Sequence, residues 1–247
     1  MREVRVHLDL PLASGRRIAL PPQAAQHVMR VLRLRSGAAL TVFDGRGGEY
    51  TATLELAGRD TATVEIGEHR AIERESPLRI TLLQGLARGE RMDWVVQKAT
   101  ELGVRRIVPV ATARSVVQLD TERGSKRTDH WLAIAAAACE QCGRNTLPEI
   151  AAPLSFEAAL RETAAIELRL ALHPDSGESL RTVLGAHAAR PETVLLIGPE
   201  GGLDETEIAL ARQGGFRVAH LGPRVLRTET AGIAALAALQ CLAGDLT

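Results

Sequence analysis

The sequence predicts an α/β protein in which a small β-rich module precedes a larger domain with a mostly parallel sheet. Strand-like runs separated by turns that contain Gly and Asp fill the first 70 residues. Beyond Pro77, apolar strand-like runs alternate with helical patterns, which is typical of a parallel sheet covered by helices on both faces. We therefore expect domains at residues 1–70 and 78–247, joined by a charged linker at residues 71–77.

The elements of the first module follow from alternation and from turn residues. Residues 4–10 alternate between apolar and polar side chains, the pattern of a half-buried strand. Pro21 and Pro22 are placed to open a short helix, because proline is tolerated in the first turn. Further strands are expected at residues 39–43, 49–56 and 61–66.

The larger domain is expected to alternate strands with helices along its whole length. Strands are expected at residues 78–86, 106–111, 166–172 and 193–197. Helices are expected at residues 92–102, 129–142, 155–163 and 179–187. Asp204 and Glu207 form a capping-box pattern that opens a further helix, and Gly214 and Gly215 end it. A last strand leads to an Ala/Leu-rich helix near the C-terminus.

Two loops follow strands near the end of the chain, and both have the composition of ligand-contacting loops. The loop at residues 198–202 is rich in glycine, so its backbone can approach a bound molecule closely. It lacks the Lys and Ser/Thr of a P-loop and carries Glu200, so it favours a neutral or cationic ligand over a phosphate. The second loop, at residues 221–231, opens the last helix. Because ligands bind at the carboxyl ends of parallel strands, the pair predicts a pocket, although each loop alone is equally well explained as a tight turn.

Composition limits the classes of protein that fit. The net charge is zero and aromatic residues are few, so the chain lacks stacking platforms for single-stranded nucleic acid. Three cysteines do not form a disulfide framework, and no signal peptide or transmembrane run is evident, so we expect a soluble cytoplasmic protein. Cys139 and Cys142 have a zinc-like spacing without a second ligand pair, so no metal is expected.

Several charged residues have both a functional and a structural interpretation. Arginines concentrate in the first 35 residues and are candidates for RNA phosphate contacts, namely Arg5, Arg30, Arg33 and Arg35. For Arg30, Arg33 and Arg35 a solvated helix face is the alternative explanation. His173 follows a strand and precedes Pro174, which fits a ligand contact or a turn. Glu229 can be explained by the helix dipole, whereas Arg227 has no such explanation.

The two long loop motifs resemble those of the RsmE family of the SPOUT superfamily, bacterial methyltransferases that act on N3 of a uridine in small-subunit ribosomal RNA. The resemblance covers nearly the whole chain. The residues that carry it are the runs 197–202, 221–231 and 97–104, His27 with residues 31–33, residues 43–45, residues 114–117, and Glu140, Gln141, Arg144 and Pro148.

The resemblance implies a PUA-like RNA-binding β-barrel followed by a parallel-sheet domain with a deep trefoil knot. It also implies S-adenosyl-L-methionine as cofactor, a homodimer with the active site near the subunit interface, and 16S rRNA in the small subunit or its late assembly form as partner, without membrane or metal. The cofactor-binding residues that it implies are Leu172, His173, Ile197, Gly198, Pro199, Glu200, Gly201, Gly202, Leu221, Gly222, Leu226, Arg227 and Thr230.

Methylation of uridine N3 requires removal of a proton and stabilisation of the resulting anion. The hypothesis is that Arg114 or Arg227 stabilises the anion and that Glu200 or Glu229 accepts the proton. Two rivals stay open: a SPOUT methyltransferase that acts on another RNA or atom, and a non-catalytic RNA-binding protein that keeps the knot as a scaffold. The roles of Glu140, Gln141 and Arg144 are open as well.

Overall fold

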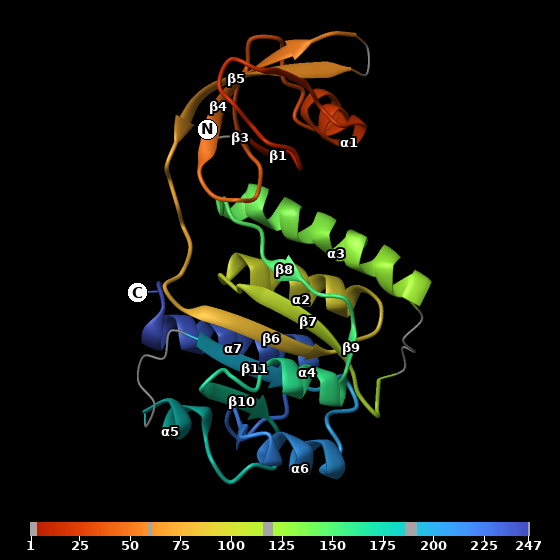
Figure 1. The fold of residues 1–247 in the computed structure, drawn as a ribbon, viewed down its shortest axis with the longest axis vertical. Helices are drawn as coiled ribbons and strands as arrows, with labels where there is room; N and C mark the ends of the chain where they lie inside the picture. Colours follow the sequence, from red (N-terminus) through yellow and green to blue (C-terminus); the bar gives the residue numbers. More distant parts are fainter. Residues whose placement is uncertain (1–3, 59–60, 116–120, 186–191, 247) are drawn as a thin grey trace. The chain divides into compact units, whose positions relative to one another are not determined.

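The computed structural model describes residues 4–58, 61–115, 121–185 and 192–246. The chain divides into two compact units (Figure 1). The first comprises Met1–Glu75 and Ala136–Leu147, and the second comprises Ser76–Ala135 and Pro148–Thr247. The structure differs from the predicted division in two respects: residues 136–147, predicted in the second domain, pack within the first unit, and residues 71–75 of the predicted linker belong to the first unit as well.

The first unit is built on a five-stranded sheet with the order β1-β3-β4-β5-β2. Its elements are β1 (Arg5–His7), β2 (Arg17–Ala19), α1 (Pro22–Gln26), the π-helix η1 (His27–Val31), β3 (Ala39–Phe43), β4 (Glu49–Leu56) and β5 (Ala62–Arg70). Only β1 and β3 pair in parallel. One core lies between the sheet and α1 with η1, and it includes Leu8, Val28 and Leu54. The alternation did not predict β2 or the π-helix.

Side chains near the end of residues 136–147 fasten that segment to the rest of the first unit. The Arg144 guanidinium donates to both oxygens of Glu75 at 2.9 and 2.7 Å. The side-chain amide of Asn145 donates from Nδ2 to the Ile72 carbonyl at 2.5 Å. Glu140 accepts from the His7 amide at 2.8 Å, and burial raises the pKa of Glu140 despite that bond. Glu140 and Arg144 therefore have structural roles in this unit.

A buried ion pair joins Arg5 to Glu49 in the first unit. Their charged atoms lie 2.6 Å apart, and the Glu49 side chain is 2 % exposed. Arg5 also donates to the Arg144 carbonyl and to the Asn145 side chain, and it lies over the Phe43 ring. Both terminal nitrogens of the guanidinium are thus engaged by protein groups in a side chain that is 7 % exposed, which does not fit a contact with an RNA phosphate. The assignment of Arg5 as an RNA contact is wrong, because alternation along a strand does not reveal a distant carboxylate.

Replacing Glu49 by Gln is expected to lower the free energy of unfolding of the first unit by about 3 kcal/mol, because the Arg5 charge stays buried without its counter-ion. Tyr50 is the only tyrosine of the sequence and lies in this unit, so its spectroscopic signal during urea denaturation measures the loss of stability of the first unit. The control is Glu65→Gln, whose partner Arg17 is 64 % exposed. Equal effects of the two substitutions would contradict the prediction, since solvent screens the exposed pair.

The same carboxylate makes the stability of the first unit depend on pH. Burial raises the pKa of Glu49, but hydrogen bonds and the charge from Arg5 more than offset it, so the pKa lies below 4.5. A carboxylate whose pKa is lower in the folded state than in the unfolded state stabilises the fold at pH values above the unfolded-state pKa. This stabilisation is lost as the pH falls through the folded-state pKa. We expect the urea concentration at the unfolding midpoint, followed through the Tyr50 signal, to fall more steeply with decreasing pH below 4.5 in the wild type than in Glu49→Gln.

The second unit is built on a seven-stranded sheet in which all pairs are parallel, with the order β12-β10-β11-β6-β7-β8 and with β9 beside β7. Its strands are β6 (Arg79–Gly85), β7 (Arg106–Ala111), β8 (Glu149–Ile150), β9 (Leu154–Ser155), β10 (Leu168–Leu172), β11 (Glu192–Ile197) and β12 (Arg217–Ala219). The short strands β8 and β9 were not predicted.

The helices of this part of the chain are α2 (Glu90–Glu101), α3 (Thr121–Cys142), α4 (Phe156–Glu162), α5 (Leu180–Gly185), α6 (Glu205–Gln213) and α7 (Thr228–Ala243). α3 begins earlier than the predicted residue 129, because its polar first turns carry no apolar stripe to reveal them. The predicted helix at 179–187 ends at Gly185, and its last two residues lie outside the described residues. No helix of the described residues has both the length and the apolar content to span a membrane.

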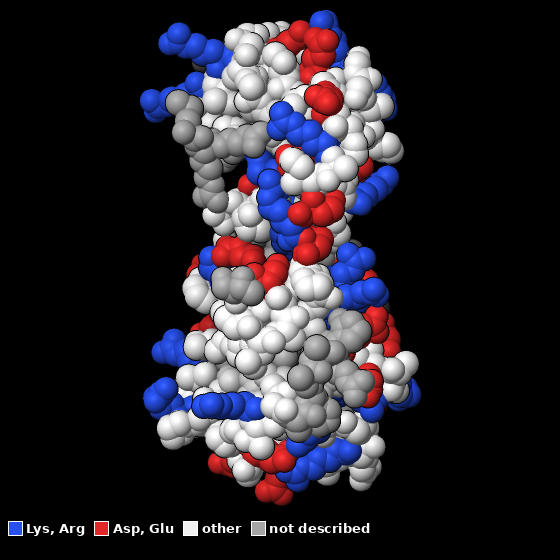
Figure 2. Space-filling model, turned by 90° about the vertical axis from the view of Figure 1, so that its left-hand side faces the viewer, with Lys and Arg blue, Asp and Glu red and all other residues white. Residues whose placement is uncertain are grey.

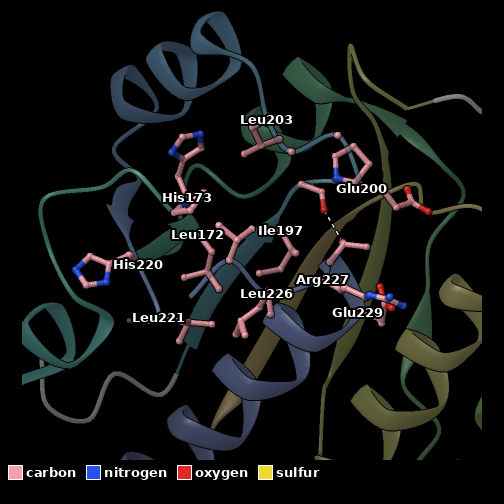
Figure 3. A pocket seen from close by; sticks show the side chains of 18 of the residues that line it. Leu172, His173, Ile197, Glu200, Leu203, His220, Leu221, Leu226, Arg227 and Glu229 are labelled. Carbon is pink, nitrogen blue, oxygen red and sulfur yellow. Dashed lines mark hydrogen bonds between the residues drawn. The ribbon is translucent and has the colours of Figure 1, made fainter. Parts of the chain in front are cut away.

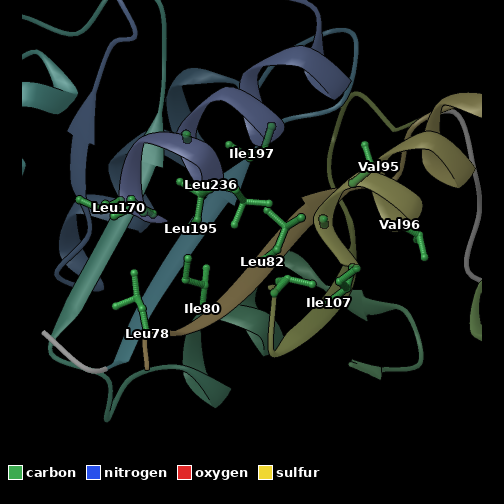
Figure 4. Packing of buried hydrophobic residues seen from close by; sticks show 14 of the residues in the cluster. Leu78, Ile80, Leu82, Val95, Val96, Ile107, Leu170, Leu195, Ile197 and Leu236 are labelled. Atoms are coloured by element: carbon green, nitrogen blue, oxygen red, sulfur yellow. The ribbon is translucent and has the colours of Figure 1, made fainter. Parts of the chain in front are cut away.

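The sheet of the second unit is covered on both faces, as parallel sheets require. One face packs on α2 and α7, where Leu82 and Leu195 meet Val95 and Leu236 (Figure 4). On the opposite face Leu83 and its neighbours pack on α4 and α6. Because every strand is parallel, the carboxyl ends of β6, β7, β10, β11 and β12 lie along one edge.

Candidate active site

A cavity of about 550 Å³ lies at this edge of the second unit, where β10, β11 and β12 end and α7 begins (Figure 3). Its volume is in the usual range for a small-molecule site. Most of the predicted site residues line it, namely Arg114, Leu172, His173, Ile197, Gly198, Pro199, Glu200, Gly201, Gly202, Leu221, Gly222, Leu226, Arg227 and Glu229. The structure therefore brings both loops and a third loop, which follows β7, to one cavity.

Thr230 is the one predicted cofactor residue that does not line the cavity. Thr228 lines it and is buried, whereas Thr230 is exposed. Two residues along an α-helix correspond to a turn of roughly 200°, so both side chains cannot face the same side. The motif indicated the loop correctly but did not give the direction of each side chain.

The loop at residues 198–202 keeps its shape through glycine and through a tight turn. The Gly202 amide donates to the Pro199 carbonyl at 2.8 Å, and Gly202 has a φ of 70°, which favours glycine. A Cβ on Gly198 would lie 2.8 Å from the Leu203 nitrogen, so no larger residue fits there. The backbone of this loop therefore forms one wall of the cavity.

The loop is tied to the start of α7 by a buried polar chain. Thr228 donates from Oγ1 to the Gly198 carbonyl at 2.5 Å, and Gln84 donates from Nε2 to Thr228 Oγ1 at 2.9 Å. Gln84 is fully buried at the end of β6. No side-chain cap bond is formed at the start of α7, and the Thr228 hydroxyl fixes the two loops together instead.

Glu200 is engaged by two arginines of the segment that follows β6. Its Oε1 accepts from the Arg88 amide at 2.9 Å and from the Arg91 guanidinium at 2.6 Å. Burial raises the pKa of Glu200, but these hydrogen bonds and the Arg91 charge outweigh it and hold the pKa below its usual value. An ion-paired carboxylate with a lowered pKa is a weak proton acceptor, so the geometry favours a positioning role for Glu200.

Glu229 is the carboxylate that lacks such partners. It lines the cavity from the first turn of α7, and its Oε2 atom is buried with no hydrogen-bond partner among the described residues. A buried oxygen without a partner is costly unless something else satisfies it. Arg227 is exposed and lies beside Glu229 in the cavity wall (Figure 3). The pair offers one acceptor and one cation at the same end of the cavity.

The remaining walls are apolar or contain histidine. Leu172, Ile197, Leu221 and Leu226 lie around one end of the cavity (Figure 3). The Nδ1 atom of His173 accepts from the Asp175 amide at 3.3 Å, which agrees with its interpretation as a turn residue that also lines the cavity.

The cavity residues outside the predicted loops and sites are Arg91, Pro174, Asp175, Leu203, Ala219 and His220, whereas Arg224, Val225, Thr228 and Ala231 lie within the predicted loop at residues 221–231 but were given no role in the site. All of the first group except Arg91 adjoin a predicted loop or site residue, so wider boundaries would have included them. Arg91 comes from α2, and no sequence signal connects it to Glu200, which lies 109 residues away.

The other candidates do not line this cavity. Arg30, Arg33 and Arg35 are exposed in the first unit, and Arg33 has a φ of 52°, unusual for a residue other than glycine. A hydrogen bond with Cys142 and burial raise the pKa of the Cys139 thiol, which keeps it protonated. In the described part of the chain, no group of three or more His, Cys, Asp or Glu is placed to hold a metal ion.

Comparison with known proteins gives the family. A family model described as "RNA methyltransferase domain" matches residues 74–240, and one described as "RNA methyltransferase PUA domain" matches residues 20–67. The ribosomal RNA small subunit methyltransferase E of Buchnera aphidicola is 32% identical over 98% of this chain and 98% of its own. The chain belongs to the ribosomal RNA small subunit methyltransferase E family.

A further relative and two solved structures are similar to this chain in sequence or in fold. The Bacillus subtilis protein is 30% identical over 90% of this chain and 91% of its own. The Neisseria gonorrhoeae enzyme, solved bound to S-adenosyl methionine, has a TM-score of 0.89 and 38% identity with full coverage of both chains. A Legionella pneumophila protein solved with bound cofactor SAM has a TM-score of 0.94 and 43% identity, again with full coverage of both chains. The expected α/β fold with an N-terminal PUA-like domain is confirmed.

Proposed function

We propose that this protein transfers a methyl group from S-adenosyl-L-methionine to N3 of a specific uridine in 16S ribosomal RNA. The observation that carries the proposal is the cavity itself, in which two glycine-containing loops meet a carboxylate and arginines in a chain of the methyltransferase E family. Two similar proteins solved with this cofactor, the Neisseria gonorrhoeae methyltransferase E and a Legionella pneumophila putative methyltransferase, support the same conclusion.

The cavity suits a cofactor of this chemistry. Leu172, Leu221 and Leu226 supply an apolar surface for the adenosine, and the 198–202 backbone supplies amides and carbonyls for its polar edges. Glu200 opposes a phosphate but is compatible with a sulfonium and an amino group. When bound, S-adenosylmethionine supplies an electrophilic methyl group on its sulfonium.

Residues of the chain accept the proton from uridine N3 and stabilise the negative charge that its loss creates. Uridine N3 carries a proton at neutral pH, so a base and a stabilised anion are both needed. Glu229 is the better proton acceptor, because Glu200 is already paired with Arg91 and has a lowered pKa. Arg114 and Arg227 line the cavity and stabilise the uridine anion electrostatically.

The RNA contacts are assigned to the first unit. Arg30, Arg33 and Arg35 are exposed in and just after η1, and their charges are available to contact phosphates. Elsewhere, positive and negative side chains are interspersed on the face drawn in Figure 2, which favours recognition of a shaped substrate over bulk attraction.

The finer features that the family resemblance implies belong to the proposal too. They are a trefoil knot in the second unit, a homodimer, a cytoplasmic location, no metal, and 16S rRNA presented within the small subunit or its late assembly form.

The deciding experiment is mass spectrometry of 16S rRNA from cells that lack this protein, compared with cells that express it. Loss of one N3-methyluridine, restored by the wild-type gene, is the expected result. Loss of a 2′-O-methyl group or of a mark in another RNA would favour the rival SPOUT methyltransferase. If calorimetry detects no binding of S-adenosylmethionine, a non-catalytic RNA-binding protein is favoured.

A further inference from the structure

Glu207 is a buried carboxylate that lies outside the cavity yet joins two of its walls. Its exposure is 6%, and it stands in the first turn of α6. Oε2 accepts from the Asp204 amide at 3.0 Å, and Asp204 Oδ1 accepts from the Glu207 amide at 2.8 Å. These two bonds form the capping box of α6.

The capping box does not account for the second oxygen of Glu207. Oε1 accepts from the amide of Ala113 at 2.8 Å, in the turn that follows β7. Thr112 and Ser115 close that turn: the Ser115 amide donates to the Thr112 carbonyl at 3.0 Å, and their hydroxyls lie 2.9 Å apart. The carboxylate thus fixes the residue immediately before Arg114 to the N-terminus of α6.

Arg114 reaches the cavity under tight constraints. Its Nη1 donates to the Gly201 carbonyl at 2.7 Å. A Cβ on Gly201 would lie 3.0 Å from Arg114 Cβ and 3.2 Å from Cδ, so the arginine lies directly against the glycine. A small rotation of the 112–115 turn would therefore move the guanidinium away from this carbonyl.

We propose that Glu207 is a positioning residue for methyl transfer, which holds Arg114 against the Gly201 carbonyl through the amide of Ala113. The inference rests on the proposed function, because it assumes that Arg114 stabilises the uridine anion. Glu207 itself touches no substrate. Its charge-assisted bonds are stronger than neutral ones, which suits a single side chain that orients a whole turn.

The test compares Glu207→Met with Asp204→Ala. The first substitution removes the bond to Ala113 together with half of the capping box. The second removes the other half of the capping box and leaves the Ala113 bond intact, so it controls for helix destabilisation. Glu207→Gln keeps one side-chain oxygen that can accept a hydrogen bond, so it should retain part of the protection and turnover that Glu207→Met loses.

Hydrogen exchange of the Ala113 amide is the readout that does not depend on activity. We expect exchange to accelerate by about tenfold or more in Glu207→Met, because one charge-assisted bond is lost, and to stay near wild type in Asp204→Ala. Unchanged exchange in Glu207→Met would overturn the proposal even if the enzyme proved inactive for another reason.

Turnover gives the second readout. In Glu207→Met kcat should fall about tenfold to a hundredfold with little change in cofactor affinity, because misplacing one group by an ångström has that effect. In an Arg114→Ala background the same substitution should cause no further loss. If Glu207→Met and Arg114→Ala each lower kcat by a factor that multiplies in the double variant, Glu207 does not act through Arg114 and the positioning role is overturned. Absence of methyl transfer in the wild type would instead refute the proposed function and leave the exchange result standing.

Discussion

Replacing Glu229 by Gln is expected to lower kcat for methyl transfer by about 10²–10⁴-fold while cofactor affinity changes only a few-fold. The amide has nearly the shape of the carboxylate but cannot accept the N3 proton. Glu229 lines the cavity and has one buried oxygen with no hydrogen-bond partner among the described residues, so it is not held by an ion pair as Glu200 is. The measurement is single-turnover transfer of a labelled methyl group, paired with calorimetry.

The matched control is Glu205→Gln, which changes a first-turn carboxylate of α6 that is exposed and does not line the cavity. It should leave kcat near the wild-type value. If Glu229→Gln turns over within a few-fold of wild type while folded, Glu229 is not the proton acceptor.

Replacing Gly85 by Ala is expected to weaken binding of S-adenosylmethionine by about a hundredfold, through a shift of the loop wall of around one ångström. A Cβ at Gly85 would lie 2.5 Å from the Pro199 nitrogen and 2.8 Å from the Gly198 carbonyl carbon. Both are backbone atoms, so neither can rotate away and the loop must move. Calorimetric titration of the cofactor measures the change.

Gly232→Ala is the control for Gly85→Ala. A Cβ there would meet Gln84 Oε1 at 3.5 Å and Ile197 at 3.6 Å, which are ordinary contacts. Because Gly232 lies inside α7, alanine should stabilise the helix by up to about 1 kcal/mol without loss of cofactor binding. Wild-type affinity in Gly85→Ala would show that the loop tolerates the shift and that the wall is less rigid than proposed.

Much of the cavity could be predicted because local sequence determines where glycine loops follow strands. The rule that parallel strands end at one edge then brings those loops together. Pairings between distant residues could not be predicted in this way. The bond from Thr228 to Gln84 spans 144 residues and that from Ala113 to Glu207 spans 94, and neither has a local signal.

The same reasoning explains why the two glutamates of the cavity could not be ranked from sequence. Glu200 lies in the loop that precedes α6, and Glu229 lies in the first turn of α7, so the sequence places both near the start of a helix. Only the fold shows that Arg91 neutralises Glu200 and that Glu229 keeps a buried oxygen without a partner. Arg5 was misassigned for a related reason, since its partner Glu49 lies 44 residues along the chain.

The first unit is assembled from two separate stretches of sequence, and this affects how the protein can be recombined. The Arg144 pair with Glu75 and the Glu140 bond to the His7 amide join residues 136–147 to the N-terminal stretch. A chimera that exchanges residues 1–75 alone would leave the buried Arg144 without its partner wherever the donor sequence lacks a carboxylate at the position of Glu75. Recombination between relatives should therefore preserve function only where both stretches are inherited from the same parent, so the two are expected to evolve as one module.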